Sequence, residues 1–490
     1  MSASPIQAAV KALPFTRTAH GITAAVNPAA TSLCLLATDL IAIVIATLAG
    51  VEIWSLVNPS ITLSNYFHLG TSLTLFFAVF LGLGLYQPAG LGPTEELRRI
   101  VLGTVLVSLV LTAAVFMTKV AGVYSRGAFL TSGALVCLLV PVSRGGLRAL
   151  CARQAWWGVP VLILGAGKTA RLLIEKLRGE PALGLKPVAC LDDDPAKHGE
   201  CLGVAVPGPL AWAPRIAAGL GVEHLLVAMP GVEREKLLAI VERYGASFAR
   251  IIVVPDLFGI ASLWVTPHDM GGVLGLEVRQ NLLVPVNRLI KRAMDLALAG
   301  ALGLLSLPVI ALAAVWIKAV SPGSAFYIQR REGEHGRTIS VPKLRTMYPG
   351  ADDLLAEHLL SSPAARAEWE THCKLRDDPR ILPGIGRLLR RTSLDELPQL
   401  FSVLKGEMSL VGPRPFPAYH LDRFDARFRA FRARVKPGLS GLWQVTARSE
   451  GDLRVQQELD TYYIRNWSLW LELVILARTV SAVLRGRGAY

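Results

Sequence analysis

The sequence is short of charge, and of acidic residues most of all. Only 18% of its 490 residues are charged and 52% are hydrophobic, whereas about a quarter of a typical soluble domain is charged. This apolar excess excludes intrinsic disorder and argues against a wholly water-soluble protein. The 51 Lys and Arg exceed the 37 Asp and Glu, for a net charge of +14. Nucleic-acid binding would explain the charge but not the apolar excess, so we expect a membrane protein that meets anionic lipid or phosphate-rich ligands.

Metal-binding cysteine patterns are also missing. The six cysteines form no CxxC pair and no cluster with histidine, which argues against a zinc site and a disulfide framework and suits a reducing compartment. No cleavable signal is visible. The first long apolar run starts near residue 31, after a neutral, Ala-rich tail at 1–30, and we interpret it as an uncleaved anchor.

Four apolar runs predict a four-helix transmembrane bundle over residues 31–150. A spanning helix needs about 20 apolar residues, and the candidate runs are 33–51, 69–86, 100–118 and 127–143. Basic residues flank the bundle at both ends and lie between the second and third runs, whereas 52–68 has no Lys or Arg. The positive-inside rule therefore places both ends of the bundle in the cytoplasm. Asp39, inside the first run, either marks function or makes a polar contact between helices.

A Rossmann-like α/β insert is predicted at 157–262. Helical stretches alternate with buried-type strands, which are expected at 159–165, 187–191, 224–229 and 250–254. The first strand runs into a GxGxxA turn, and the second ends at Asp192. Such a turn can hold a phosphate, with the acidic residue on a ribose. Because glycine is also needed merely to make the turn, a sheet that binds no dinucleotide is an equal alternative.

The apolar run 296–317 predicts a membrane helix that bends or breaks. Ser306 and Pro308 lie in its middle, and proline removes a backbone donor and clashes with the preceding turn. Basic residues flank both ends of the run. We interpret it as a re-entrant helix at 288–319 that returns to the cytoplasmic side, with freed backbone groups satisfied by side chains such as Ser306. A kinked spanning helix is the alternative.

The block after residue 340 is dense in groups that bind phosphate. Cations and carboxylates alternate in KLRTM (343–347), RRTSLDELPQ (390–399) and GPRP (412–415). Paired arginines suit a bidentate grip on phosphate, and adjacent carboxylates among cations suit a nucleophile beside an Mg²⁺ ligand. The alternative for residues 393–396 is a helix capping box.

Two segments predict helices that lie at a membrane surface. Phe424, Phe428 and Phe431 recur at helical spacing among arginines, which is typical of a basic interfacial helix with an aromatic stripe. The apolar segment 469–484, with tryptophans at its start, is the second candidate. For the first segment, packing on the protein core is the alternative.

Residues 288–490 resemble the bacterial polyprenyl-phosphate hexose-1-phosphate transferases, the monotopic phosphoglycosyl transferases. The shared motifs, in order, are KRAMD, SPGSAFYIQRREG, KLRTM, RRTSLDELPQLFSVLKGEMSLVGPRP, KPGLSGLWQV and LDTYYI. The spans and the insert make the whole chain similar to the large form of this family. ARAEWETHCKLRDDPRI and the terminal RGAY are most like the undecaprenyl-phosphate galactose phosphotransferases. Leu307 and Leu344 depart from the family's usual Ser before the proline and Phe in the KLRTM position.

The resemblance implies an α+β catalytic domain at 283–490 and a reaction. Galactose-1-phosphate would pass from UDP-galactose to undecaprenyl phosphate with release of UMP, as the first membrane step of exopolysaccharide, capsule or O-antigen synthesis. UDP-glucose is the close alternative. Asp395 matches the nucleophile and Glu396 the Mg²⁺ ligand. The substrate-binding residues implied are Lys343, Arg345, Arg390, Arg414 and Asp460, the last near the lipid-facing end of the site.

The expected partners follow from this reaction. They are the UDP-sugar, undecaprenyl phosphate, anionic lipid of the bacterial inner membrane and a second copy of the chain, with the catalytic domain on the cytoplasmic face and no nucleic acid. A membrane-anchored NAD-dependent nucleotide-sugar dehydratase is a distant alternative, but it needs a Tyr-x-x-x-Lys pair that the sequence lacks. A non-catalytic relative is disfavoured by the intact Asp395 and Glu396 pair.

Overall fold

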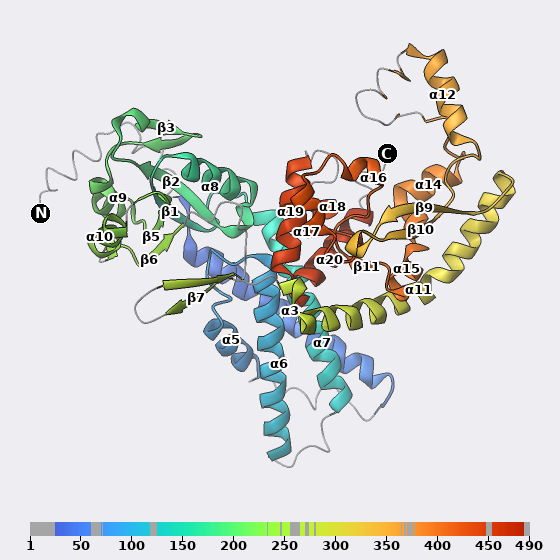
Figure 1. Cartoon of the computed structure of the whole chain (residues 1–490). Coiled ribbons are helices and arrows are strands. Elements are labelled where there is room, and N and C mark those ends of the chain that lie inside the picture. The colour runs from blue at the N-terminus through green and yellow to red at the C-terminus, as the bar shows by residue number, and fades with distance from the viewer. Residues whose placement is uncertain are drawn as a thin grey trace, which may run out of the picture. The chain divides into compact units, whose positions relative to one another are not determined.

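Two compact units make up the chain, Met1–Leu257 and Phe258–Tyr490. The computed structural model (Figure 1) describes residues 25–59, 70, 72–117, 125–232, 234–245, 247–254, 265–269, 274–278, 281–363, 365–366, 369, 375, 378–446 and 453–484.

The first unit begins with apolar helices. They are α3 (Pro28–Ser55), α5 (Ser72–Gly82), α6 (Pro93–Met117) and α7 (Arg126–Cys151). Within the described residues, α3, α6 and α7 are long and apolar enough to cross a membrane, and a fourth such helix lies in the second unit. The predicted second span falls partly outside the described residues. Inside them its helix, α5, has 11 residues, too few to cross alone.

A buried charge cluster joins these helices. The Arg144 side chain on α7 is fully buried, and its Nη2 lies 2.6 Å from Asp39 Oδ2 on α3. Its Nη1 lies 2.7 Å from Glu96 Oε1 on α6 and donates to the Leu85 carbonyl. Arg148 also pairs with Glu96. Asp39 therefore makes a contact between helices, which is the role expected of a charge kept inside a membrane bundle.

A four-stranded parallel sheet follows. Its strands are β1 (Val159–Leu164), β2 (Leu185–Leu191), β5 (His224–Val227) and β6 (Arg250–Val253), in the order β2-β1-β5-β6. All four predicted strands are confirmed within a few residues at their ends. Helices α8 (Lys168–Gly179), α9 (Ala213–Leu220) and α10 (Arg234–Gly245) alternate with them, and a short hairpin of β3 (Gly199–Cys201) and β4 (Val204–Val206) follows β2. Every residue of β1 is buried, as a strand covered on both faces requires.

Asp192, at the end of β2, turns back onto the glycine turn. Its Oδ2 accepts a hydrogen bond of 2.8 Å from the Ala166 amide, and its Oδ1 accepts one from the Asp194 amide. Gly165 needs its glycine, because φ is +97° and an added Cβ would meet Met229 at 2.6 Å. Asp192, which the sequence predicted as a ligand of a ribose, therefore makes hydrogen bonds to the protein's own backbone, one of them in the glycine turn.

The second unit contains the long helix α11 (Pro285–Val320), which follows the hairpin of β7 (Val265–Asp269) and β8 (Leu274–Val278). The helix is continuous through Pro308, and Figure 1 shows that it changes direction partway along its length. Ser306, buried beside the proline, donates from Oγ to the Gly303 carbonyl at 2.9 Å. The expected bend at a proline is therefore present without a break in the helix.

The rest of this unit is a small α+β body. An antiparallel pair, β9 (Phe326–Glu332) with β10 (Thr338–Leu344), and a parallel pair, β11 (Ser409–Val411) with β12 (Gly438–Ser440), lie among helices. The helices are α12 (Ala351–Ser361), α14 (Ile385–Thr392), α15 (Gln399–Lys405), α16 (Ala418–Leu421), α17 (Ala426–Arg432), α18 (Leu442–Thr446), α19 (Leu453–Asn466) and α20 (Leu469–Leu484). Its main core joins α11, α15, α19 and α20 around β11.

The two predicted surface helices instead pack inward. Phe424 is buried, Phe428 packs against its ring edge to face, and Phe431 joins the main core. In α20, Ile475 is fully buried. Trp467, two residues before the start of α20, donates a hydrogen bond to Glu472 within the helix. The prediction of a lipid-facing aromatic stripe was wrong, because the same helical spacing also serves a helix that covers a core.

Candidate active site

One face of the β9–β10 ladder forms the floor of a pocket. Gln329 pairs in register with Val341, and Lys343 lies two residues further along β10. Since side chains alternate along a strand, Gln329, Arg331, Val341 and Lys343 share this face. All four line the pocket, together with Glu396, Gln399, Arg414, Pro415, Gly438 and Leu439.

The acidic pair lies on a tight turn opposite this ladder. α14 ends at Ser393, whose φ of +57° is left-handed, and residues Leu394–Glu396 form one turn of 3₁₀ helix. The Ser393 side chain makes no capping hydrogen bond. The alternative of a capping box is therefore wrong: Ser393 precedes the 3₁₀ turn, but its left-handed backbone ends α14 and its side chain makes no hydrogen bond to the turn.

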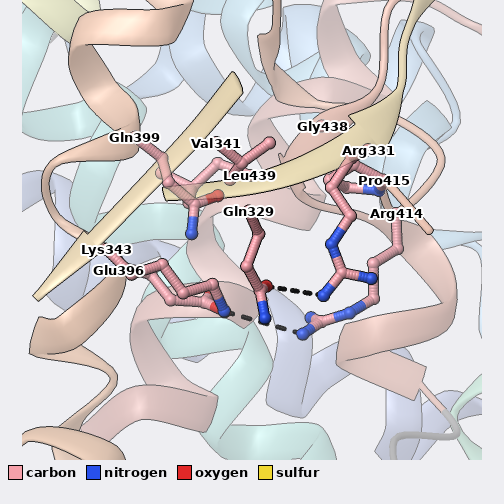
Figure 2. A pocket seen from close by; sticks show the side chains of 10 residues that line it. All are labelled: Gln329, Arg331, Val341, Lys343, Glu396, Gln399, Arg414, Pro415, Gly438 and Leu439. Atoms are coloured by element: carbon pink, nitrogen blue, oxygen red, sulfur yellow. Dashed lines mark hydrogen bonds and ion pairs between the residues drawn. The ribbon is translucent and has the colours of Figure 1, made fainter. Parts of the chain in front are cut away.

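Glu396 is held between two cations. Lys343 Nζ lies 2.8 Å from Glu396 Oε1, and Arg414 Nη2 lies 3.5 Å from the same oxygen. In Figure 2 both cationic side chains point toward Glu396. The three come from β10, the 3₁₀ turn and the loop after β11, so the fold assembles the charges from three separate motifs.

Asp395 is held in a different environment from its neighbour. Burial, together with the negative charge of Glu396, raises its pKa to about 6, against the opposing pull of Lys343 and Arg390. Burial in turn lowers the pKa of Arg390, whose Nε donates to Thr346 Oγ1 at 3.1 Å. A half-buried carboxylate beside two cations suits a nucleophile that must ionise near neutral pH.

Arg345 and Asp460 lie outside this pocket. Arg345 donates to the carbonyls of Ser321 and Pro322, both at 2.8 Å, so its guanidinium ties down the chain after α11. Asp460 is only 3% exposed and faces the guanidinium of Arg432, 3.5 Å away. Asp395 and Arg390 are not among the residues that line the pocket either. The substrate-binding roles of Arg345 and Asp460 therefore stay predictions.

Comparison with known proteins agrees with the motifs. Residues 286–486 match the bacterial sugar transferase family, and residues 82–255 match a CoA-binding domain. The chain is 33% identical to an undecaprenyl-phosphate galactose phosphotransferase of Salmonella typhimurium, over 81% of this chain and 82% of that one. The chain belongs to the bacterial sugar transferase family. It is also 31% identical to a UDP-glucose:undecaprenyl-phosphate glucose-1-phosphate transferase of Escherichia coli, over 67% and 68% of the two chains.

A shorter relative of this sugar transferase matches fewer than half of the residues of this chain. The exopolysaccharide production protein ExoY of Sinorhizobium fredii is 42% identical over 207 residues, which make up 42% of this chain and 90% of that one. The matched length is close to that of the sugar transferase match at 286–486.

Seven residues that line the pocket of the sugar transferase were given no role from sequence. They are Gln329, Arg331, Val341, Gln399, Pro415, Gly438 and Leu439. Gln329 and Arg331 lie inside the SPGSAFYIQRREG motif, and their spacing of two would have placed them on one face of a strand. Only the register of β9 with β10 shows that Lys343 shares this face. Gln399 follows the acidic pair by three residues and begins α15. Leu439 could not be placed, because only the pairing of β11 with β12 brings it to the pocket.

The donor set of this sugar transferase fits a hard cation. Among the described residues, no three His, Cys, Asp or Glu side chains cluster as a complete metal cage. Mg²⁺ does not need one, since it binds through one or two carboxylates, waters and substrate phosphates. Glu396 supplies carboxylate oxygens of this kind in the pocket, and Asp395 is the adjacent residue on the same turn.

Proposed function

We propose that this sugar transferase moves hexose-1-phosphate from a UDP-sugar to undecaprenyl phosphate and releases UMP. The observation that carries the proposal is the acidic pair of Asp395 and Glu396 among Lys343, Arg390 and Arg414. Both substrates are polyanions, and these cations lower the repulsion between them. Relatives that match most of the chain are named for this reaction.

The proposed reaction proceeds in two displacements. A carboxylate oxygen of Asp395 attacks the phosphorus that carries the sugar, the bond from that phosphorus to the UMP oxygen breaks, and UMP leaves with the electron pair. An oxygen of undecaprenyl phosphate then attacks the same phosphorus. The aspartyl bond breaks, and Asp395 returns as a carboxylate. Two steps through a covalent adduct replace one direct meeting of two anions.

Glu396 is the residue we propose to hold Mg²⁺, with Asp395 beside it. Bound there, the ion neutralises charge on the phosphate oxygens. Lys343 and Arg414 already contact Glu396 and hold its carboxylate at the pocket.

We also propose that α11 is re-entrant. Its buried residues form one stripe along the whole helix: Lys291, Asp295, Ala299, Gly303, Ser306, Ile310, Ala313 and Ile317. Both halves pack on one body. Arg292 donates to the Val403 and Leu404 carbonyls, and Ile310 and Ile317 pack with Leu344 and Ile385. A straight helix of 36 residues is about 54 Å long and would carry one half across the membrane, away from that body.

The opposite face of α11 supports the same proposal. Leu289, Leu304, Leu305 and Leu312 are each about 70% exposed. Exposed leucines along both halves suit contact with the acyl chains of a single leaflet. We propose that this leaflet belongs to the bacterial inner membrane, with the catalytic unit on its cytoplasmic face.

Galactose is the proposed sugar, and glucose is the alternative, since relatives named for each match this chain. The test is to incubate purified protein with undecaprenyl phosphate, Mg²⁺ and each of a panel of UDP-sugars, and to measure UMP. UDP-galactose should be turned over fastest. Faster turnover of UDP-glucose would change the sugar alone, and no UMP from any UDP-sugar would reject the proposed reaction.

A further inference from the structure

We infer that Asp460 is a positioning residue that acts on the pocket through Arg432 and Arg414. The inference rests on the proposed function, because it assigns a role within that reaction. Arg432 lies on α17 and Asp460 on α19, and neither lines the pocket. Their side chains are about 5% and 4% exposed, so neither can touch a substrate directly.

The guanidinium of Arg432 makes the link. Its Nη2 donates a hydrogen bond to the backbone carbonyl of Arg414, and its Nε lies 3.5 Å from Asp460 Oδ2. The same guanidinium lies over the Phe416 ring at 5.1 Å from its centroid. Arg432 is thus fixed from three sides, and one of the groups it binds is the main chain of a pocket arginine.

The Arg414 segment is held from its other side by backbone alone. The Gly412 amide donates to the Ser440 carbonyl, and the Gly438 amide donates to the Pro413 carbonyl at 2.9 Å. Contact is so close that a Cβ on Gly438 would lie 2.0 Å from the Gly412 nitrogen. Arg432 completes this frame, so the Arg414 side chain leaves a fixed backbone toward Glu396.

Asp460 is what keeps Arg432 in place. A buried guanidinium that loses its counterion is strongly unfavourable, and it relieves this by moving toward water. Movement of Arg432 would release the Arg414 carbonyl and loosen the contact of Arg414 with Glu396. Glu332 and His420 are the other titratable groups that interact with Arg432, and the interaction with Asp460 is the stronger of the two with carboxylates.

Hydrogen–deuterium exchange tests this link without requiring turnover. In the full chain, Asp460→Asn should increase exchange in peptides that contain Gly412, Arg414 and Gly438, and Asp460→Glu should restore most of the protection. Unchanged exchange in Asp460→Asn would overturn the inference, whether or not the protein transfers sugar. Glu96→Gln, which removes a buried carboxylate paired with Arg144 and Arg148 in the other unit, is the matched control and should leave these peptides unchanged.

A double-mutant cycle tests whether Asp460 affects activity through Arg414. Asp460→Asn should lower kcat/KM for UDP-galactose about tenfold in the native background but less than about twofold in Arg414→Ala, because the two act in one chain of contacts. Equal losses in both backgrounds, as a merely structural role gives, would overturn the inference and leave the proposed function standing. If the native protein releases no UMP with any UDP-sugar, the proposed function fails, and the exchange result alone decides whether Asp460 positions Arg414.

Discussion

At the scale of single residues, the two adjacent carboxylates are set apart by their surroundings. Glu396 contacts Lys343 and Arg414. The pKa of Asp395 is instead raised to about 6 by burial and by the negative charge of Glu396, although Lys343 and Arg390 act to lower it. Neighbours in sequence thereby acquire different environments: Glu396 is a paired anion, and Asp395, the proposed nucleophile, is not.

Asp395→Asn should abolish UMP release from the UDP-sugar even without the lipid acceptor, because the amide cannot form the adduct. We expect a loss of about a thousandfold or more, measured as UMP over time. Glu396→Gln should also be severely impaired, with part of the activity recovered at high Mg²⁺. Robust turnover by Asp395→Asn would remove this residue from the mechanism.

Activity should also fall with pH in a predictable direction. The attacking form of Asp395 is ionised, so kcat/KM should drop about tenfold per pH unit below about 6 and stay level above it. The raised pKa means that the folded protein binds this proton more tightly than the unfolded chain does, so ionisation of Asp395 destabilises the fold. Asp395→Asn should therefore have a higher Tm than the native protein at pH 7.5. An equal or lower Tm would contradict the burial of this charge.

At the scale of elements, α11 is fastened to its own unit by a buried polar cluster near its start. Lys291 pairs with Glu472 of α20, and Asp295 accepts hydrogen bonds from Ser409 Oγ at 2.7 Å and the Leu410 amide of β11. Glu472 also accepts from Tyr463 and Trp467, and burial raises its pKa. The membrane helix and the strand that leads to Arg414 are thus one rigid assembly.

The re-entrant course of α11 predicts the same labelling at its two ends. Single cysteines introduced at the exposed positions 284 and 322 should both react with a membrane-impermeant maleimide added from the cytoplasmic side. Reaction of either one from the outside would replace the re-entrant helix with a spanning one. Pro308→Ala should straighten the helix and lower activity, although no group of the pocket is changed.

At the scale of the whole molecule, the residues proposed for chemistry all lie in the second unit. The insert offers one candidate ligand site, the Gly165 turn, and Asp192 already occupies the Ala166 amide there. A carboxylate at this amide opposes a phosphate, including that of CoA, for which the matching family is named. We therefore expect the insert to be structural or regulatory, and to support a homodimer.

A fragment of residues 280–490 should still associate with membranes and release UMP, at a lower rate than the full chain. It keeps its own core and α11, and the relative from Sinorhizobium fredii has a comparable length. The loss should appear instead in Tm and in dimer formation, measured by cross-linking or light scattering. A folded, lipid-bound fragment without activity would place the insert in the active site.

Gly167→Val in the full chain also tests whether the insert is separate from catalysis. Gly167 has no neighbour within 4 Å of an added Cβ, so the fold should tolerate valine. We expect native UMP release within about twofold, the range of a neutral surface change. Loss of catalysis with an unchanged Tm would show that the turn takes part in the reaction.

The sequence by itself determined the apolar helices, the parallel strands and the family, because hydrophobic runs, strand periodicity and contiguous motifs are local properties. Tertiary structure decided which side chains meet. Asp39 pairs with Arg144, which lies 105 residues away in the sequence, and Lys343 pairs with Glu396, which lies 53 residues away. Only the packing of α17 on the core showed that its phenylalanines face inward and that Arg432 reaches from Asp460 to Arg414. A helical pattern records which residues share a face, but the partner of that face depends on segments far away in the chain.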